Sequence, residues 1–144
     1  MIIDDLQLTG ALQISLNNEI VHQCDNLVVT AGKNWVAGRF KDGSIPDEMS
    51  HMAIGSADTA PAAGNTALAT ELNRIALTTA GGTVSTNTVQ YDASWTSAAA
   101  AYAIKEAGIF NAATGGTMLA RTTFAVINKG TDDTVSISWT ITVS

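Results

Sequence analysis

The sequence has few of the residues on which catalytic and metal-binding sites are usually built. Among its 144 residues it has one cysteine, Cys24, and two histidines, His22 and His51. One cysteine excludes an internal disulfide and a thiolate zinc cluster, and two histidines cannot form a three-histidine metal site. We therefore expect no metal and no cofactor, with Cys24 as a structural thiol and both histidines at the surface.

Charge is also scarce, and one sign dominates. Charged residues make up 14% of the chain, against roughly 25% in ordinary soluble domains. The balance is acidic, with 7 Lys and Arg against 13 Asp and Glu and a net charge of −6. Binding to nucleic acid or to an anionic membrane needs clustered basic residues, so we expect neither partner. The abundant Thr, Ser and Ala suit close packing against protein subunits instead.

Long apolar runs are absent as well. No stretch approaches the ~20 apolar residues of a membrane-spanning helix. The first residues, Met1–Asp5, lack the basic start of a secretory signal and place two acidic residues where its apolar run would continue. We expect neither a membrane span nor a cleaved signal peptide.

Alternation of apolar and hydroxyl side chains is the clearest pattern that is present. Over residues 135–143, Val, Ile, Trp, Ile and Val alternate with Ser and Thr. This period of two is typical of an antiparallel strand with one face on a core. Further segments of this kind recur at intervals of 10–15 residues. The sequence predicts a mostly β protein with an antiparallel β-sandwich or jelly-roll-like fold.

The remaining segments complete this picture. We predict one short helix at about 30–41, capped by Thr30, ended by Asp42-Gly43 and packed on a sheet through Trp35 and Phe40. The other predicted elements are a hairpin at 6–23 turning at Asn17-Asn18, strands at 51–55, 74–79, 89–95, 102–110 with a bulge at Gly108, and 117–124, a turn at 128–133, a loop at 56–66, and a helical turn or extended arm at 67–73. Residues 1–26 would form an N-terminal arm or hairpin, and residues 27–144 the sandwich of a single-domain protein.

No pair of carboxylates or nucleophile with its base stands out, so we expect that the protein is not an enzyme. Glu106 is the exception among the acidic residues, because it lies inside an apolar strand. We interpret it as half of an ion pair with Lys105, Arg121 or Arg74. Asp132-Asp133 lacks the spacing of a calcium loop and is interpreted as part of a turn. A small hydrolase that uses Glu106 or His51 is the least favoured alternative.

The aromatic residues divide into core and surface candidates. Tyr91 and Trp139 fall on the apolar side of their strands, which places them in the core. Trp95 ends its strand and is the best candidate for an exposed ring at an interface. A sugar site would combine exposed Trp95 and Tyr102 with Asp92 or Asn87.

Two parts of the chain carry motifs that resemble a known group. The first comprises Leu27–Ala37 and Met49–Gly55, and the second contains EAGIFNAATGGTMLART at Glu106–Thr122, INKG at Ile127–Gly130, and the final strand. Together they resemble small virion proteins of tailed bacteriophages, over about residues 27–144. Members of that group are described as capsid decoration (cement) proteins or as tail-fibre and baseplate components.

The resemblance implies a structural virion protein, made in the host cytoplasm and most consistent with a decoration protein on the outer surface of the capsid. Its partners would be the major capsid protein, whose subunits it bridges, and further copies of itself in a symmetric oligomer. A tail-fibre or baseplate module is the first alternative, and a carbohydrate-binding module for host attachment is the second. The predicted contact residues are Leu6, Leu8, Leu12, Ile14, Asp58, Pro61 and Trp95.

Overall fold

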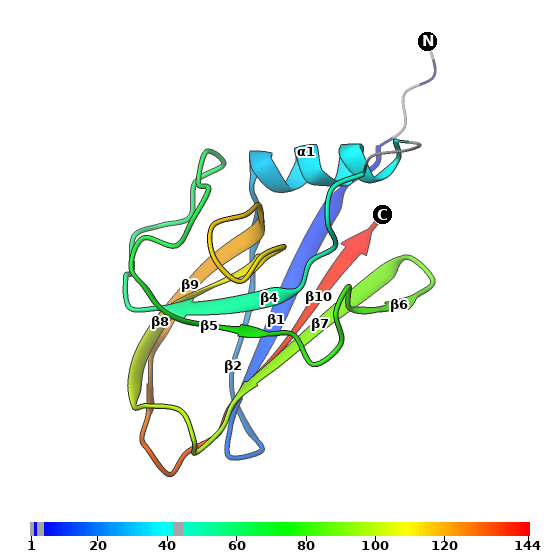
Figure 1. Cartoon of the computed structure of the whole chain (residues 1–144). Helices are drawn as coiled ribbons and strands as arrows, with labels where there is room; N and C mark the ends of the chain where they lie inside the picture. The colour runs from blue at the N-terminus through cyan, green and yellow to red at the C-terminus, as the bar shows by residue number, and fades with distance from the viewer. Residues whose placement is uncertain (1, 3–4, 42–44) are drawn as a thin grey trace.

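The computed structural model describes residues 2, 5–41 and 45–144. Two five-stranded antiparallel sheets pack face to face, which confirms the predicted β-sandwich (Figure 1). One sheet has the order β2-β1-β10-β7-β6 and the other the order β3-β9-β8-β4-β5. The elements are β1 (Leu8–Leu16), β2 (Glu19–Asp25), β3 (Leu27–Val28), α1 (Thr30–Arg39), β4 (His51–Gly55), β5 (Glu71–Ala76), β6 (Thr83–Ser85), β7 (Thr88–Trp95), β8 (Tyr102–Phe110), β9 (Met118–Lys129) and β10 (Val135–Val143).

The alternation in β10 has the predicted structural consequence. Val135, Ile137, Trp139 and Ile141 are all buried between the two sheets, and the Ser and Thr residues between them point outward. Val143 continues the pattern but is 39% exposed, because the sandwich ends at this point. β10 lies at the centre of its sheet, so its inward face contributes directly to the main core.

The N-terminal hairpin forms, but it is not an arm. Asn17 and Asn18 have φ angles of 51° and 67°, the left-handed conformation of a tight hairpin turn. β1 pairs with β10 along its full length, from Leu8 opposite Val143 to Leu16 opposite Val135. The hairpin of β1 and β2 is therefore an integral part of the sandwich.

Helix α1 begins one residue earlier than an N-cap at Thr30 would require. Val29 occupies the cap position without a side-chain hydrogen bond, so the capping prediction for Thr30 is wrong. The predicted packing of Phe40 is also wrong, since this side chain is 82% exposed. Trp35 does pack against the core. The predicted stop at Asp42-Gly43 lies outside the described residues.

The hairpin of β8 and β9 departs from the prediction in two ways. Gly108 pairs regularly with Arg121, so it is not the site of a bulge. The ladder instead shifts between Ile104 and Glu106, where three β9 residues face Lys105, and again between Ile109 and Phe110. β9 also runs on to Lys129, so the turn predicted at 128–133 begins later.

β3, β6 and the first residues of β5 were not predicted as strands.

The long strands place two groups of loops at opposite ends of the sandwich. Helix α1 and the C-terminus lie at one end, and the turns between β1 and β2 and between β9 and β10 lie at the other (Figure 1). We call these the α1 end and the turn end. No helix in the described ranges is long and apolar enough to cross a membrane.

Candidate interaction surface

An apolar groove opens at the α1 end, between the helix and the ends of β1 and β10. Its volume is about 420 Å³, and its lining is made of Leu6, Gln7, Leu8, Lys33, Val36, Phe40 and Val143. Leu6 is 68% exposed and Phe40 is 82% exposed. Large apolar side chains gathered in one exposed depression are typical of a contact site for another molecule.

Backbone hydrogen bonds hold the floor of this groove in place. Gln7 donates to the carbonyl of Ser144 at 2.8 Å, and Ser144 donates back to Gln7 at 3.0 Å. These two bonds extend the ladder of β1 and β10 and fix the chain next to Leu6. Two of the predicted contact residues, Leu6 and Leu8, thus line an exposed groove.

The helix wall of the groove is fixed by the close approach of Gly32 to β9. A Cβ atom at Gly32 would lie 2.1 Å from the carbonyl oxygen of Leu119, so only glycine allows this contact. The helix therefore sits directly on the strand backbone, with Trp35 and Val36 packed against the core. Its exposed side carries Lys33 and ends with Phe40.

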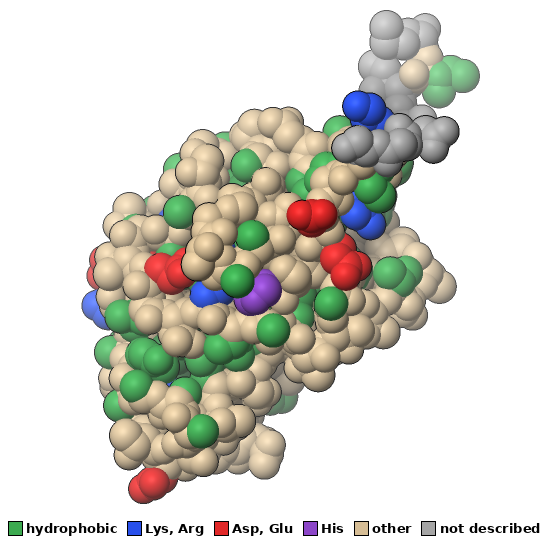
Figure 2. Space-filling view, in the orientation of Figure 1, with side chains coloured by type: hydrophobic (Ala, Val, Ile, Leu, Met, Phe, Trp, Pro, Cys, Tyr) green, Lys and Arg blue, Asp and Glu red, His purple; other side chains and the backbone are tan. Residues whose placement is uncertain are grey.

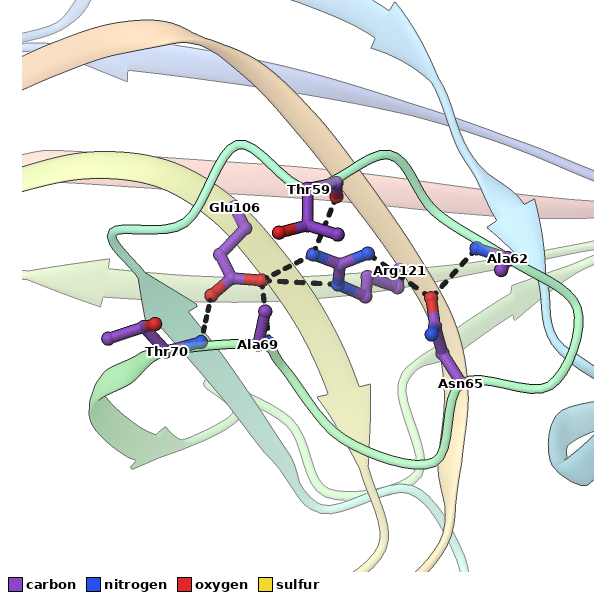
Figure 3. Close-up of polar contacts among 7 residues, drawn as sticks. All are labelled: Thr59, Ala62, Asn65, Ala69, Thr70, Glu106 and Arg121. Atoms are coloured by element: carbon purple, nitrogen blue, oxygen red, sulfur yellow. Dashed lines mark hydrogen bonds and ion pairs between the residues drawn. The ribbon is translucent and has the colours of Figure 1, made fainter.

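A second exposed element is the loop from Ser56 to Thr70, which a buried ion pair anchors (Figure 3). Arg121 on β9 donates to one oxygen of Glu106 on β8, from Nη2 at 2.8 Å and from Nε at 3.1 Å. Glu106 is 0% exposed and Arg121 is 1% exposed. Of the three partners predicted for Glu106, the structure selects Arg121.

The loop itself completes the hydrogen bonds of both charged groups. Glu106 accepts from the backbone N–H groups of Ala69, at 3.0 Å, and Thr70, at 2.7 Å. Arg121 donates to the carbonyl of Thr59 at 2.9 Å and to the side-chain oxygen of Asn65 at 3.1 Å. Every side-chain nitrogen of Arg121 and both oxygens of Glu106 have a hydrogen-bond partner, so the desolvation of the pair is offset by directed contacts that also fix the loop.

Further contacts tie this loop to its surroundings. The N–H of Thr30 at the start of α1 donates to the carbonyl of Ala63 at 2.8 Å. Asp58 reaches Lys105 at 3.8 Å and stays 81% exposed, while Pro61 is half-buried. The loop thus presents small, mostly exposed side chains on an ordered backbone, which lowers the entropy lost when a partner binds it.

A second arginine orders the neighbouring hairpin loop at 111–116. Arg74 stacks on the ring of Phe110, with its guanidinium carbon 3.7 Å from the ring centroid. It donates to the carbonyls of Ala112 and Gly115 at 3.0 and 2.9 Å, and forms an ion pair with Glu71 at 2.7 Å. Two loops beside α1 are therefore held by arginines with carboxylate partners.

Three of the predicted contact residues lie in the core. Leu12 and Ile14 are 2% and 1% exposed, since both point inward from β1. Trp95 is 1% exposed, and its indole N–H donates to Asn73 at 2.9 Å. The exposed ring predicted at Trp95 is wrong, because Tyr91, Ala93 and Trp95 share the inward face of β7. The main cue for a sugar site is lost with it.

The groups with chemical potential do not gather in one place. His22 lies on β2, against the ring of Phe124, whereas His51 lies on β4 in the other sheet and bonds Ser50 at 2.8 Å. Burial raises the pKa of the Cys24 thiol, and a hydrogen bond with Thr122 opposes only part of this effect. In the described part of the chain, no three His, Cys, Asp or Glu residues are grouped so that they could hold a metal ion.

The surface drawn in Figure 2 is poor in charge. Backbone and uncharged polar groups make up most of it, with apolar side chains scattered between them and only a few acidic and basic groups. Such a face suits contact with protein more than with a polyanion. No protein-family model, no curated protein and no solved structure matches the chain.

Sequence reasoning missed the helix side of the groove and the anchoring of the loop. A signal for the groove was present, because residues 26–41 contain three basic residues and no acidic residue around the apolar helix positions. The contacts of Arg121 with Thr59 and Asn65 carry no local signal, since 56 or more residues separate the partners in sequence.

Proposed function

We propose that the chain is a structural, non-enzymatic subunit of a tailed-bacteriophage virion, most specifically a capsid decoration protein on the outside of the head. It would bridge neighbouring subunits of the major capsid protein. The observation that carries the proposal is the combination of an exposed apolar groove with an adjacent ordered loop at one end of a rigid sandwich. The resemblance of residues 27–144 to virion proteins supplies the biological setting.

The physical basis of the proposal is that decoration needs stable contact surfaces and no reaction. Binding energy would come from apolar area removed from water in the groove, at roughly 25 cal/mol per Å². The anchored loop adds contacts without a large ordering cost. The loop meets the start of α1 and the groove runs along the helix to Phe40, so a partner surface that spans the helix would engage both.

The proposal is tested by adding the purified chain to phage heads that lack it. Decorated heads should resist heat and chelators better than bare heads, and each head should carry on the order of hundreds of copies. A Phe40→Ser variant should bind heads more weakly, whereas Val84→Ser, at another exposed apolar position that does not line the groove, should bind normally. Identical failure of bare and decorated heads would contradict decoration. A handful of copies located on the tail would move the protein to a fibre or baseplate.

A further inference from the structure

The turn end of the sandwich is as well ordered as the α1 end, and it is acidic. Asn17 in the first turn donates to Asp133 in the last turn at 2.9 Å, and Asp133 also accepts from the N–H of Gly130 at 2.7 Å. The N–H of Thr134 donates to Asn17 at 2.9 Å. These bonds join the two turns into one tip, and the bond from Asn17 contributes most to lowering the pKa of Asp133, which keeps it charged.

Exposed acidic and apolar groups lie together at this tip. Glu19 and Asp132 are exposed beside Asp133. Ile20 is 51% exposed and Val21 is 45% exposed. Val21 has no partner on β1, because Ile14 pairs with His22 and Ser15 pairs with Ile20. The unpaired residue forms a β-bulge in β2. A bulge of this kind turns side chains outward and blocks regular addition of another strand.

The charge of Lys129 helps to lower the pKa of Asp133, but this lysine does not reach the surface beside the acids. Lys129 is 2% exposed and donates to three backbone carbonyls, those of Ala99, Ala100 and Gly130. Ile20 and Val21 therefore lie next to carboxylates whose charge is not neutralised by an exposed Lys or Arg of the described tip.

The α1 end has the opposite character around its groove. Lys33 lines the groove and Lys41 follows Phe40, and neither forms an ion pair with a described carboxylate. Among the residues that the structure describes, no carboxylate lines the groove itself. Asp47 and Glu48 line a separate cavity with Arg39, and Asp5 precedes Leu6 without lining the groove.

We propose that copies of this chain associate head to tail, with the turn end of one copy seated in the apolar groove at the α1 end of the next. Ile20 and Val21 would enter the groove beside Leu6 and Phe40, and Glu19 and Asp132 would face Lys33 and Lys41. β1 spans the two ends with nine residues, so the surfaces lie about 30 Å apart and one copy cannot join them within itself. Such a contact is heterologous and produces a ring or a filament.

Charge argues against the two symmetric pairings of these surfaces. Joining two grooves would bring Lys33 and Lys41 of one copy toward the same residues of the other. Joining two turn ends would oppose Glu19, Asp132 and Asp133 with their own copies. Like charges facing each other across a contact reduce its stability, whereas the head-to-tail pairing matches opposite charges.

The test uses charge reversal at each end, read out as mass in solution by light scattering and sedimentation over a range of protein concentrations. The native chain should form species larger than 14.9 kDa, and raised salt should weaken them. Lys33→Glu with Lys41→Glu makes one variant, and Glu19→Lys with Asp132→Lys makes the other. Each should be monomeric alone. Their mixture should assemble again, because the native turn end of the first variant matches the native groove of the second, and the reversed groove of the first matches the reversed turn end of the second.

The control reverses charge away from both ends, at Asp92→Lys on the outer face of the first sheet, and should assemble as the native chain does. A native chain that stays monomeric at all concentrations would overturn the inference. So would assembly that survives the Glu19→Lys, Asp132→Lys variant, or a mixture that stays monomeric. Both contacts use the groove, so binding to heads is measured with the Glu19→Lys, Asp132→Lys variant, whose groove is unchanged and stays free in the monomer. If this variant decorates heads but the native chain does not associate, only this inference is lost. If the native chain associates but the variant does not bind heads, only the proposed function is lost.

Discussion

Single residues fix the shape of the 56–70 loop, and Arg121 and Glu106 each form two hydrogen bonds with it. Replacing Arg121 by Ala removes the partner of a carboxylate that is 0% exposed. Leaving one buried charge unpaired typically costs about 3–5 kcal/mol. We expect a loss of this size in the free energy of unfolding of Arg121→Ala, measured by urea denaturation, together with faster proteolysis within residues 56–70.

The matched control is the exposed pair of Lys105 and Asp58, whose nitrogen and oxygen lie 3.8 Å apart. Solvent screens such a pair, so Lys105→Ala should change the stability by less than about 1 kcal/mol. Equal losses in the two variants would show that burial of the Arg121 pair is not what anchors the loop.

Tyr91 gives a pH-dependent prediction at the same scale. Burial raises the pKa of its phenol from the ordinary value of about 10 to about 12. Above pH 10 the unfolded chain releases this proton while the folded chain retains it, so the free energy of unfolding falls as the pH rises from about 10 to 12. Phenolate absorbance should show a titration step at a pH of about 12 that disappears when Tyr91 is replaced by Phe. A Tyr91→Phe variant should lose less stability over this interval than the native chain does.

At the element scale, the position of α1 depends on Gly32. An exposed helix glycine replaced by alanine would gain about 1 kcal/mol in helix propensity. At Gly32 the added Cβ would meet the Leu119 carbonyl oxygen at 2.1 Å, so the helix must move away from β9. We expect Gly32→Ala to lower the stability by about 2–3 kcal/mol and to widen the groove, measured as higher binding of a hydrophobic dye.

Gly64 is the control for this substitution, because a Cβ there meets nothing within 4 Å. Gly64→Ala should leave both stability and dye binding close to the native values. Equal stability of the Gly32→Ala and native chains would mean that the helix is not seated on the strand as described.

Elements were predictable where local pattern and final environment agree. β10 and the Asn17-Asn18 turn were predicted from alternation and from residues that tolerate positive φ. Trp95 was predicted to be exposed because it ends its strand. Its alternation with Tyr91 and Ala93 was the better guide, since it places the ring on the inward face. Phe40 was predicted to pack on a sheet because it shares a helical face with Trp35. Helical spacing identifies such a face, but it does not show whether another part of the chain covers it. The end of β9 was missed because Phe124–Ile127 wraps around a bulge and loses its period of two.

The candidate surface was predictable only in part, for a similar reason. Leu6 and Leu8, two of the predicted contact residues, line the groove, but Leu12 and Ile14 continue the same apolar series into the core. The apolar series can be identified in the sequence. The residue at which the second sheet begins to cover that series cannot. That point depends on the packing of α1 and β10 around the start of β1, which brings together three segments that are distant in sequence.

At the scale of the whole molecule, β1 makes the N-terminal segment a condition of folding. It lies between β2 and β10, pairs with β10 along nine residues and contributes Leu12 and Ile14 to the main core. A chain that begins at residue 27 would leave β10 with an unpaired edge and an open core. We expect residues 27–144 alone to lack the cooperative unfolding transition of the full chain, measured by circular dichroism during heating.

Two point variants separate the role of β1 in folding from its role in contacts. Leu12→Ala creates a cavity in the core and should cost about 2–5 kcal/mol in stability. Leu6→Ala removes a side chain that is 68% exposed, so it should leave stability nearly unchanged while weakening association at the groove. If the 27–144 fragment folded, the N-terminal segment would be a dispensable arm after all. If Leu12→Ala and Leu6→Ala lost equal stability, Leu12 could not lie in the core. The middle of β1 thus stabilises the core, because neighbouring elements cover it. The segment that leads into β1, at Leu6, stays exposed and is available for contacts.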